Sequence, residues 1–451
     1  MTLRERGGLQ AVMDSSRIGR FQIAIILVCA AVAMFDGFDT QAIALAAPEI
    51  ANVWRVEPSV FGGVFASGLF GALIGAITFG LAADRFGRKP SLIAAVALFA
   101  VVTLATPFVI SVPALIVVRF VTGIGLGGAL PGIISLTSEY SPARSRATIV
   151  SLMFCGFPLG AVLGGVAAAQ LMPVFGWQVL FYIGSLLPLL LLLPAIILVV
   201  PESIRFLALK GQTQTVERLL GRLQAELDWD GAVDGAGPER APSIGRLFER
   251  HLALGTLILT VTFLLSLMLS YFLVNWLPLL TRQAGVGMQS AVLGVAALNL
   301  GAILGCLIIG RLVDRYGAAL PIGVAYVLGG GAIALIGMNA HSSGLMLTLC
   351  FIAGGFSVGA QMCVVALCAT FYKTDLRATG VGWLMGAGRI GAILGPILGG
   401  VLIAQGMSAT NLFFVAGGVA VLTATGVFAM GWFVLRKPRA ADPGEAQTQN
   451  G

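Results

Sequence analysis

The sequence predicts an all-α membrane protein with twelve transmembrane helices in two pseudo-symmetric six-helix bundles. Three observations lead to this fold class: 58% of the 451 residues are hydrophobic, only 10% are charged, and the pattern of the first half recurs in the second. Ordinary soluble domains carry about 25% charged residues. Apolar runs of about 20 residues, long enough to cross a hydrocarbon core of about 30 Å, follow one another along the chain. We place these spans at 22–45, 58–82, 91–110, 112–135, 147–170, 178–200, 252–278, 289–310, 320–339, 345–369, 379–404 and 411–435.

The basic residues predict how the spans are oriented. When the N-terminus is assigned to the cytoplasm, 23 of the 27 Lys and Arg residues fall in cytoplasmic segments, and only Arg55 and Arg282 fall in outside segments. By the positive-inside rule, both termini are expected in the cytoplasm. The net charge of +7 therefore reports topology, and no nucleic-acid partner is expected.

A long polar stretch divides the chain into two halves. It separates six predicted spans from six and mixes charged residues with Gly, Pro and Gln. The polar C-terminal tail is expected to be disordered. The predicted organisation is an N-terminal six-helix bundle at 1–200, a cytoplasmic linker at 201–250, a C-terminal bundle at 251–436 and the tail at 437–451.

The two halves repeat one another. The segment Gly80–Gly87 (GLAADRFG) recurs as Gly310–Gly317 (GRLVDRYG), an offset of 230, and Pro48 matches Pro278 at the same offset. Two parallel six-helix repeats, related by an axis along the membrane normal, describe one large transporter architecture. Its substrate site lies near the midplane between the halves, which rock to give alternating access.

Four ionisable residues lie within predicted spans and lack an ionisable counterpart in the other half. Each costs at least about 2.5–3.5 kcal/mol at a helix centre, so each is expected to face the bundle interior or a wet cavity. A buried structural ion pair remains the alternative explanation. The four residues are Asp36, Asp39, Arg119 and Arg389.

Their depths predict separate roles for the two aspartates. A rise of about 1.5 Å per residue places Asp36 level with Arg119, so we expect those two to form an ion pair. Asp39 lies one turn further out without a basic partner that the sequence can place, and is expected to take up the proton. The guanidinium groups of Arg119 and Arg389 suit a substrate carboxylate, because their planar fork binds both oxygens. Proton coupling by Asp36 and Asp39 with anion binding by the two arginines indicates uptake of an organic anion.

Charged residues at the cytoplasmic ends of the spans are predicted to form a gate. Asp84 is expected to cap the eleventh helix near Arg377, and the corresponding loop of the second half is expected to reach Arg146. Such contacts would close the inner side and break when it opens. A purely topogenic role of these charges remains open. The residues assigned to this gate are Asp84, Arg85, Arg88, Glu139, Arg146, Asp314, Arg315 and Arg377.

No metal site or cofactor is expected. The six cysteines fall inside apolar spans without a CxxC pair, and the two histidines are far apart in the sequence. We interpret the cysteines as packing residues. No nucleophile and base form a recognisable set, so the chain is not expected to be an enzyme.

These motifs resemble the major facilitator superfamily over nearly the whole chain. Gly80–Lys89 (GLAADRFGRK) fits the superfamily pattern GxxxDRxGRR/K between the second and third spans. Pro201–Leu207 (PESIRFL) resembles the PESPRFL motif, with Ile204 in place of the proline. The corresponding second loop, Gly317–Ala319, lacks the basic pair, which implies a weaker gate in the C-terminal half.

Within the superfamily, the chain resembles the aromatic acid:proton symporter family. Asp36–Thr40 (DGFDT) looks like the DGxD motif of that family, and the segments 119–131 and 377–391 resemble its fourth and eleventh spans. The resemblance implies a proton-coupled symporter that imports a small aromatic carboxylate of the benzoate or hydroxybenzoate class across a bacterial inner membrane. It implies that the two aspartates are needed for transport. Phe35 and Phe38 are the aromatic residues we expect beside the ring.

Other readings of the same fold remain open. A drug:proton or organic-anion:proton antiporter is the nearest alternative, although span five lacks the GPxxGG-type motif and two cavity arginines suit cationic drugs poorly. A transporter-like sensor would need an output domain, which the linker and the tail do not offer. The expected partners are the aromatic carboxylate, protons and the lipid bilayer, and the chain is expected to act as a monomer.

Overall fold

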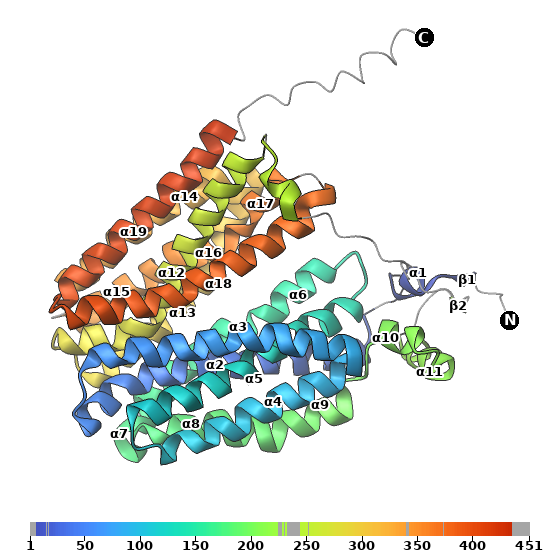
Figure 1. The fold of residues 1–451 in the computed structure, drawn as a ribbon, viewed down its shortest axis with the longest axis horizontal. Helices are drawn as coiled ribbons and strands as arrows, with labels where there is room; N and C mark the ends of the chain where they lie inside the picture. Colours follow the sequence, from blue (N-terminus) through green and yellow to red (C-terminus); the bar gives the residue numbers. More distant parts are fainter. Residues whose placement is uncertain are drawn as a thin grey trace, which may run out of the picture.

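The computed structural model describes residues 6–14, 16, 18–223, 228–229, 231, 244–250, 252–339, 342–372 and 374–434. Within these residues, twelve helical segments are long and apolar enough to cross a membrane (Figure 1), which confirms the predicted fold class. The exception to an all-helical chain is a parallel pairing of two residues each, β1 (Arg6–Gly7) with β2 (Asp228–Trp229). The tail predicted to be disordered, 437–451, and part of the linker (224–227, 230 and 232–243) lie outside the described residues.

The six spans of the N-terminal half are built from eight α-helices, because two of the spans contain more than one helix. The fifth span joins α6 to α7, and the sixth joins α8 to α9 through a π-helical turn at Pro188–Leu192. The helices are α2 (Arg20–Trp54), α3 (Phe61–Phe86), α4 (Arg88–Ala105), α5 (Val112–Glu139), α6 (Arg146–Phe154), α7 (Gly156–Phe175), α8 (Gln178–Leu187) and α9 (Leu193–Val199).

The C-terminal half repeats this arrangement. Its tenth span is interrupted by a π-helical turn at Gly354–Val358, and a second such turn at Met430–Val434 follows the last helix. The helices are α12 (Ala253–Gln283), α13 (Met288–Tyr316), α14 (Ala319–Met338), α15 (Ser343–Ala353), α16 (Gly359–Cys363), α17 (Val365–Phe371), α18 (Thr374–Ala404) and α19 (Ala409–Ala429).

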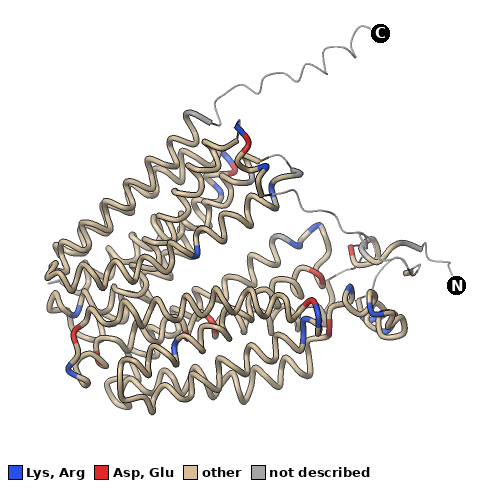
Figure 2. Tube along the Cα trace, in the orientation of Figure 1, with Lys and Arg blue, Asp and Glu red and all other residues tan. Residues whose placement is uncertain are grey.

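The two ends of the helices differ in charge. We call the end at which α2, α12 and α18 begin the terminal end, to the right in Figure 1. Lys and Arg gather there, whereas the middle of the helices carries few charges (Figure 2). Three short helices lie at the same end: α1 (Leu9–Asp14), α10 (Ile204–Leu209) and α11 (Thr213–Arg222). Apolar residues of all three, such as Val12, Ile204 and Val216, are buried against the N-terminal half.

The two halves meet through equivalent pairs of helices. Helix α3 of the N-terminal half packs against α18 of the C-terminal half. The equivalent helix of the C-terminal half, α13, packs against α7 of the N-terminal half. The contact between α3 and α18 is close because glycines form it: a Cβ added to Gly62 would lie 2.9 Å from the carbonyl oxygen of Pro396. This contact lies at the end opposite the terminal end, and the helices of the two halves diverge toward the terminal end (Figure 1).

The repeated loop has the same conformation in both halves. Gly87 follows α3 with φ of 107°, and Gly317 follows α13 with φ of 80°. Residues with a side chain rarely adopt these positive φ values, so glycine is required at both positions. The turn has the same backbone geometry in both halves, which explains why this glycine is repeated although the basic residues after it are not.

Candidate functional site

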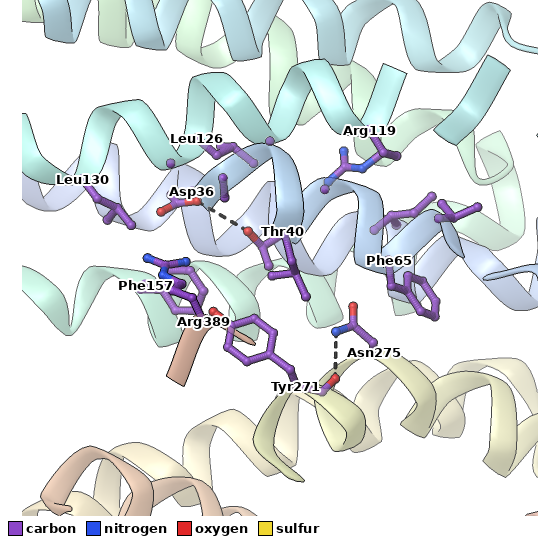
Figure 3. Close-up of a pocket in the computed structure, with 17 residues that line it drawn as sticks. Asp36, Thr40, Phe65, Arg119, Leu126, Leu130, Phe157, Tyr271, Asn275 and Arg389 are labelled. Atoms are coloured by element: carbon purple, nitrogen blue, oxygen red, sulfur yellow. Dashed lines mark hydrogen bonds between the residues drawn. The ribbon is translucent and has the colours of Figure 1, made fainter. Parts of the chain in front are cut away.

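A polar cavity lies between the two halves. It encloses about 590 Å³ of space free of protein atoms, part of it open to solvent. Residues from α2, α3, α5 and α7 line one side, and residues from α12 and α18 line the other (Figure 3). Three of the four predicted ionisable residues line it: Asp36, Arg119 and Arg389.

The fourth, Asp39, forms a buried ion pair with Arg119. The guanidinium Nη1 of Arg119 lies 3.0 Å from Oδ2 of Asp39, and neither side chain is more than 4% exposed. Nη2 of Arg119 donates to the backbone oxygen of Asp39 at 3.3 Å, and the hydroxyl of Thr103 donates to Oδ1 at 2.9 Å. The expectation that Arg119 pairs with Asp36, and that Asp39 has no basic partner, is therefore wrong.

The direction of helical side chains explains this error. Each side chain in an α-helix tilts toward the N-terminus of its own helix. Because α5 runs from the opposite end toward the terminal end, the long side chain of Arg119 extends back toward the opposite end. It thereby passes the level of Asp36 and reaches Asp39, one turn further along α2. The spacing of residues along the sequence gives the levels of the Cα atoms, and the length of the arginine side chain moves its charge away from that level.

Asp36 is left without a basic partner at hydrogen-bond distance. The residue is 4% exposed and lines the cavity. Its Oδ1 accepts a weak hydrogen bond of 3.4 Å from the hydroxyl of Thr40, one turn further along α2. Its Oδ2 is buried and has no hydrogen-bond partner among the described residues. A proton on this oxygen would remove a buried charge that few groups stabilise.

Arg389 lies across the cavity from Asp36. It comes from α18 and lies beside Phe157 in Figure 3. Within the described part of the chain, its guanidinium takes part in no ion pair or hydrogen bond, although it is close enough to Asp36 for electrostatic attraction. Arg389 thus offers its whole guanidinium to a ligand, whereas Arg119 bonds Asp39 through both Nη atoms and keeps only its buried Nε without a partner among the described residues.

The aromatic residues of the cavity differ from those predicted. Phe38 packs against Gly164 of α7 and Gly184 of α8, and Phe35 packs against the core of the N-terminal half. Neither lines the cavity, so this structure does not support the expectation that they flank a bound ring. The aromatic side chains that do line it are Phe65 of α3, Phe157 of α7 and Tyr271 of α12.

Two polar residues of α12 were missed by the sequence reasoning. Tyr271 and Asn275 line the cavity from the C-terminal half. The offset of 230 that relates the halves pairs them with Gln41 and Leu45. Asn275 therefore has an apolar counterpart, and the symmetry comparison would have found it had uncharged polar residues been included.

At the terminal end, several predicted gate residues bond within the N-terminal half. Arg88 lies 3.6 Å from Glu139, and Oε1 of Glu139 accepts from the hydroxyl of Ser203 at 2.9 Å. Oε1 of Glu202 accepts from the backbone nitrogen of Arg88 at 2.8 Å. These bonds tie the loop after α3 and the end of α5 to the segment Pro201–Leu207. The residues therefore hold one half together in this structure.

The other gate residues do not meet across the halves. Arg146 pairs with Asp14 of α1 at 2.6 Å, on its own half. The remaining members are exposed and form no ion pair with any described residue, so the expected contact of Asp84 with the region of Arg377 is not formed here. Because the halves diverge at this end, contacts between them are expected to be broken in this conformation. The closed gate stays a prediction. These exposed members are Asp84, Arg85, Asp314, Arg315 and Arg377.

Known proteins resemble the chain over nearly its full length. A model of the Major Facilitator Superfamily matches residues 29–374 and 299–450. The 4-hydroxybenzoate transporter PcaK of Acinetobacter baylyi is 37% identical over 420 residues, 91% of either chain. The gallate transporter of Pseudomonas putida is 35% identical over 429 residues, 94% of this chain and 95% of the other. The xylose transporter XylE from E. coli, in a partially occluded inward-open conformation, shares the fold with a TM-score of 0.68 and 19% identity, covering 92% of this chain and 98% of that one.

Proposed function

The chain belongs to the Major Facilitator Superfamily, and from this membership and its cavity we propose that it is a proton-coupled symporter that imports a small aromatic carboxylate by alternating access. The membership agrees with the superfamily predicted from the motifs. The proposal places this multi-pass protein in a bacterial inner membrane, with the terminal end in the cytoplasm. We further propose that the protein acts as a monomer, that it needs no cofactor, and that the proton gradient drives transport.

The observation that carries the proposal is the placement of Arg389 opposite Asp36 in one cavity between the halves. A guanidinium binds a carboxylate through two parallel hydrogen bonds, and this geometry favours a planar anion. Arg389 has no such partner among the described residues, whereas Arg119 already holds Asp39. The site therefore offers one vacant receptor for one substrate carboxylate.

The remaining lining of the cavity suits an aromatic ring. Three aromatic side chains line it: Phe65, Phe157 and Tyr271. Aromatic side chains pack against rings in offset or edge-to-face arrangements. The relatives named for 4-hydroxybenzoate and gallate are named for aromatic carboxylates, which supports the same substrate class here. A cationic drug would meet the guanidinium of Arg389, which has no ion-pair partner among the described residues, whereas Asp39 already neutralises Arg119, and this disfavours the drug-antiporter alternative.

The same pair of charges supplies a route to proton coupling. An ionised Asp36 attracts Arg389 and competes with an incoming carboxylate for it. When Asp36 takes up a proton, this competition ends and the guanidinium becomes available to the substrate. Proton binding and anion binding then favour one another, as linkage between two sites requires. Asp36 is thus the proposed proton carrier, and Asp39 is proposed to act by holding Arg119.

Binding of a matched ligand panel to the purified protein tests the substrate class. The panel contains benzoate, cyclohexanecarboxylate as a non-aromatic acid, benzamide as an uncharged analogue and benzylamine as a cation. We expect benzoate to raise the melting temperature most, since a ligand that binds only the folded state stabilises it. Stabilisation by benzylamine with none by the carboxylates would contradict the proposal and favour a carrier of cations.

A further inference from the structure

Asn275 presents a fixed hydrogen-bond acceptor to the cavity. The residue lies on α12 and is 3% exposed. Its Nδ2 donates to the backbone oxygen of Tyr271 at 2.7 Å, which fixes the orientation of the amide. The side-chain oxygen points away from α12 into the cavity in Figure 3 and accepts no hydrogen bond from the described residues.

The chemistry of this oxygen selects a ligand group. An amide oxygen accepts hydrogen bonds and repels another acceptor, so it suits a hydroxyl and does not suit a carboxylate. The carboxylate of a substrate has Arg389 as its receptor in the same cavity. A ligand that satisfies both groups therefore carries an acid at one place and a hydroxyl at another.

The spacing along α12 agrees with a ring between these two groups. Tyr271 lies within electrostatic reach of Arg389 and Asp36, and it points toward Arg389 in Figure 3. Asn275 lies four residues, or about one helical turn, beyond Tyr271, about 6 Å further toward the opposite end. A ring whose carboxylate meets Arg389 and whose face lies along Tyr271 would direct its far edge toward Asn275.

We infer that Asn275 is a specificity-determining residue that accepts a hydrogen bond from a ring hydroxyl, so that the protein prefers hydroxylated aromatic acids to benzoate. This inference rests on the proposed function, because it assumes that an aromatic carboxylate occupies the cavity. It deepens that function by naming the ring hydroxyl as the substituent that Asn275 of the C-terminal half binds.

Calorimetric titration of a matched ligand pair tests the inference. The dissociation constants of 4-hydroxybenzoate and benzoate are measured for the wild type, for Asn275→Leu and for the control Asn299→Leu. Asn299 is 4% exposed on α13, makes the equivalent hydrogen bond to the backbone oxygen of Val295 at 2.9 Å, and does not line the cavity. The control thus removes the same local bond without changing the site.

We expect the wild type to bind 4-hydroxybenzoate more tightly than benzoate, by about three- to tenfold, the contribution of one neutral hydrogen bond. In Asn275→Leu this preference should disappear through weaker binding of 4-hydroxybenzoate, with benzoate affinity unchanged. Asn299→Leu should keep the wild-type ratio. If Asn275→Leu folds poorly, Asn275→Ala removes the same acceptor with a smaller side chain and should give the same loss of preference.

Each other outcome has a distinct meaning. If Asn275→Leu or Asn275→Ala weakens both acids equally, or keeps the wild-type ratio, Asn275 does not read the hydroxyl and the inference is overturned. If the wild type binds both acids equally well, the inference is overturned while the proposed function stands. If neither acid binds the wild type, the proposed function fails, and the inference fails with it.

Discussion

The carboxylate of Asp39 lies 3.0 Å from the guanidinium of Arg119, buried where α2 and α5 pack together. The hydroxyl of Thr103 adds a hydrogen bond from α4, so three helices of one half share this carboxylate. The two charges compensate one another. Asp36 and Arg389 are consequently the ionisable residues of the cavity without an ion-pair partner among the described residues, and we assign the coupling of proton and substrate to them.

Breaking the buried pair should destabilise the protein. Removing one partner of a buried ion pair leaves an uncompensated charge and costs about 3–5 kcal/mol. Asp39→Leu and Arg119→Met should each lower the melting temperature of the purified protein, and the double variant should lose less than the two single changes together. Arg85→Met, at an exposed position of the terminal end, serves as the control and should melt like the wild type. Wild-type melting of both single variants would show that the pair contributes nothing to stability.

Replacing Arg389 should weaken substrate binding while leaving stability largely unchanged. Arg389→Lys keeps the charge but loses the bidentate fork, which removes about 1.5–3 kcal/mol, or one to two decades of affinity. Calorimetric titration with 4-hydroxybenzoate measures the dissociation constant. Arg119→Lys makes a useful comparison, since its main effect should fall on the melting temperature. Wild-type affinity in Arg389→Lys would rule out this arginine as the anion receptor.

The gate hypothesis concerns a conformation other than the one described here. Asp84 is exposed at the terminal end, where the halves diverge, and should find its partner near Arg377 only when that end closes. Asp84→Asn should therefore slow turnover in proteoliposomes severalfold while leaving the dissociation constant unchanged. Asp314→Asn, in the loop without the basic pair, should have a smaller effect. A normal turnover rate in Asp84→Asn at equal reconstitution would leave the charge a topogenic role only.

The architecture could be predicted from the sequence because hydrophobic length and internal repetition determine it. Twelve apolar runs and the repeat of Gly80–Gly87 at Gly310–Gly317 suffice for the fold, and both glycines after the repeated helix have positive φ values. Ionisable residues within spans are costly, which is why Asp36, Arg119 and Arg389 were found from their positions alone and all line one cavity.

The contacts within the cavity could not be predicted in the same way. Residue spacing gives the level of a Cα atom, whereas a long side chain carries its charge away from that level along the helix axis. Arg119 therefore pairs with Asp39 and not with Asp36. Phe35 and Phe38 were expected beside the ring, but residues next to one another in sequence face different sides of a helix, and neither lines the cavity that Asp36 lines. Tyr271 and Asn275 escaped notice because uncharged polar residues are common enough in spans to carry little signal.

The most direct test of the proposed function compares the wild type with Asp36→Asn in proteoliposomes. Labelled 4-hydroxybenzoate is measured in two assays: accumulation driven by an inward proton gradient, and counterflow, in which external label exchanges with internal unlabelled acid without a gradient. An asparagine imitates the protonated aspartate, so we expect Asp36→Asn to retain counterflow and to lose driven accumulation. The wild type should show both, and a protonophore should abolish its accumulation. Wild-type accumulation that persists without any gradient, or driven accumulation by Asp36→Asn at the wild-type level, would contradict proton coupling through Asp36.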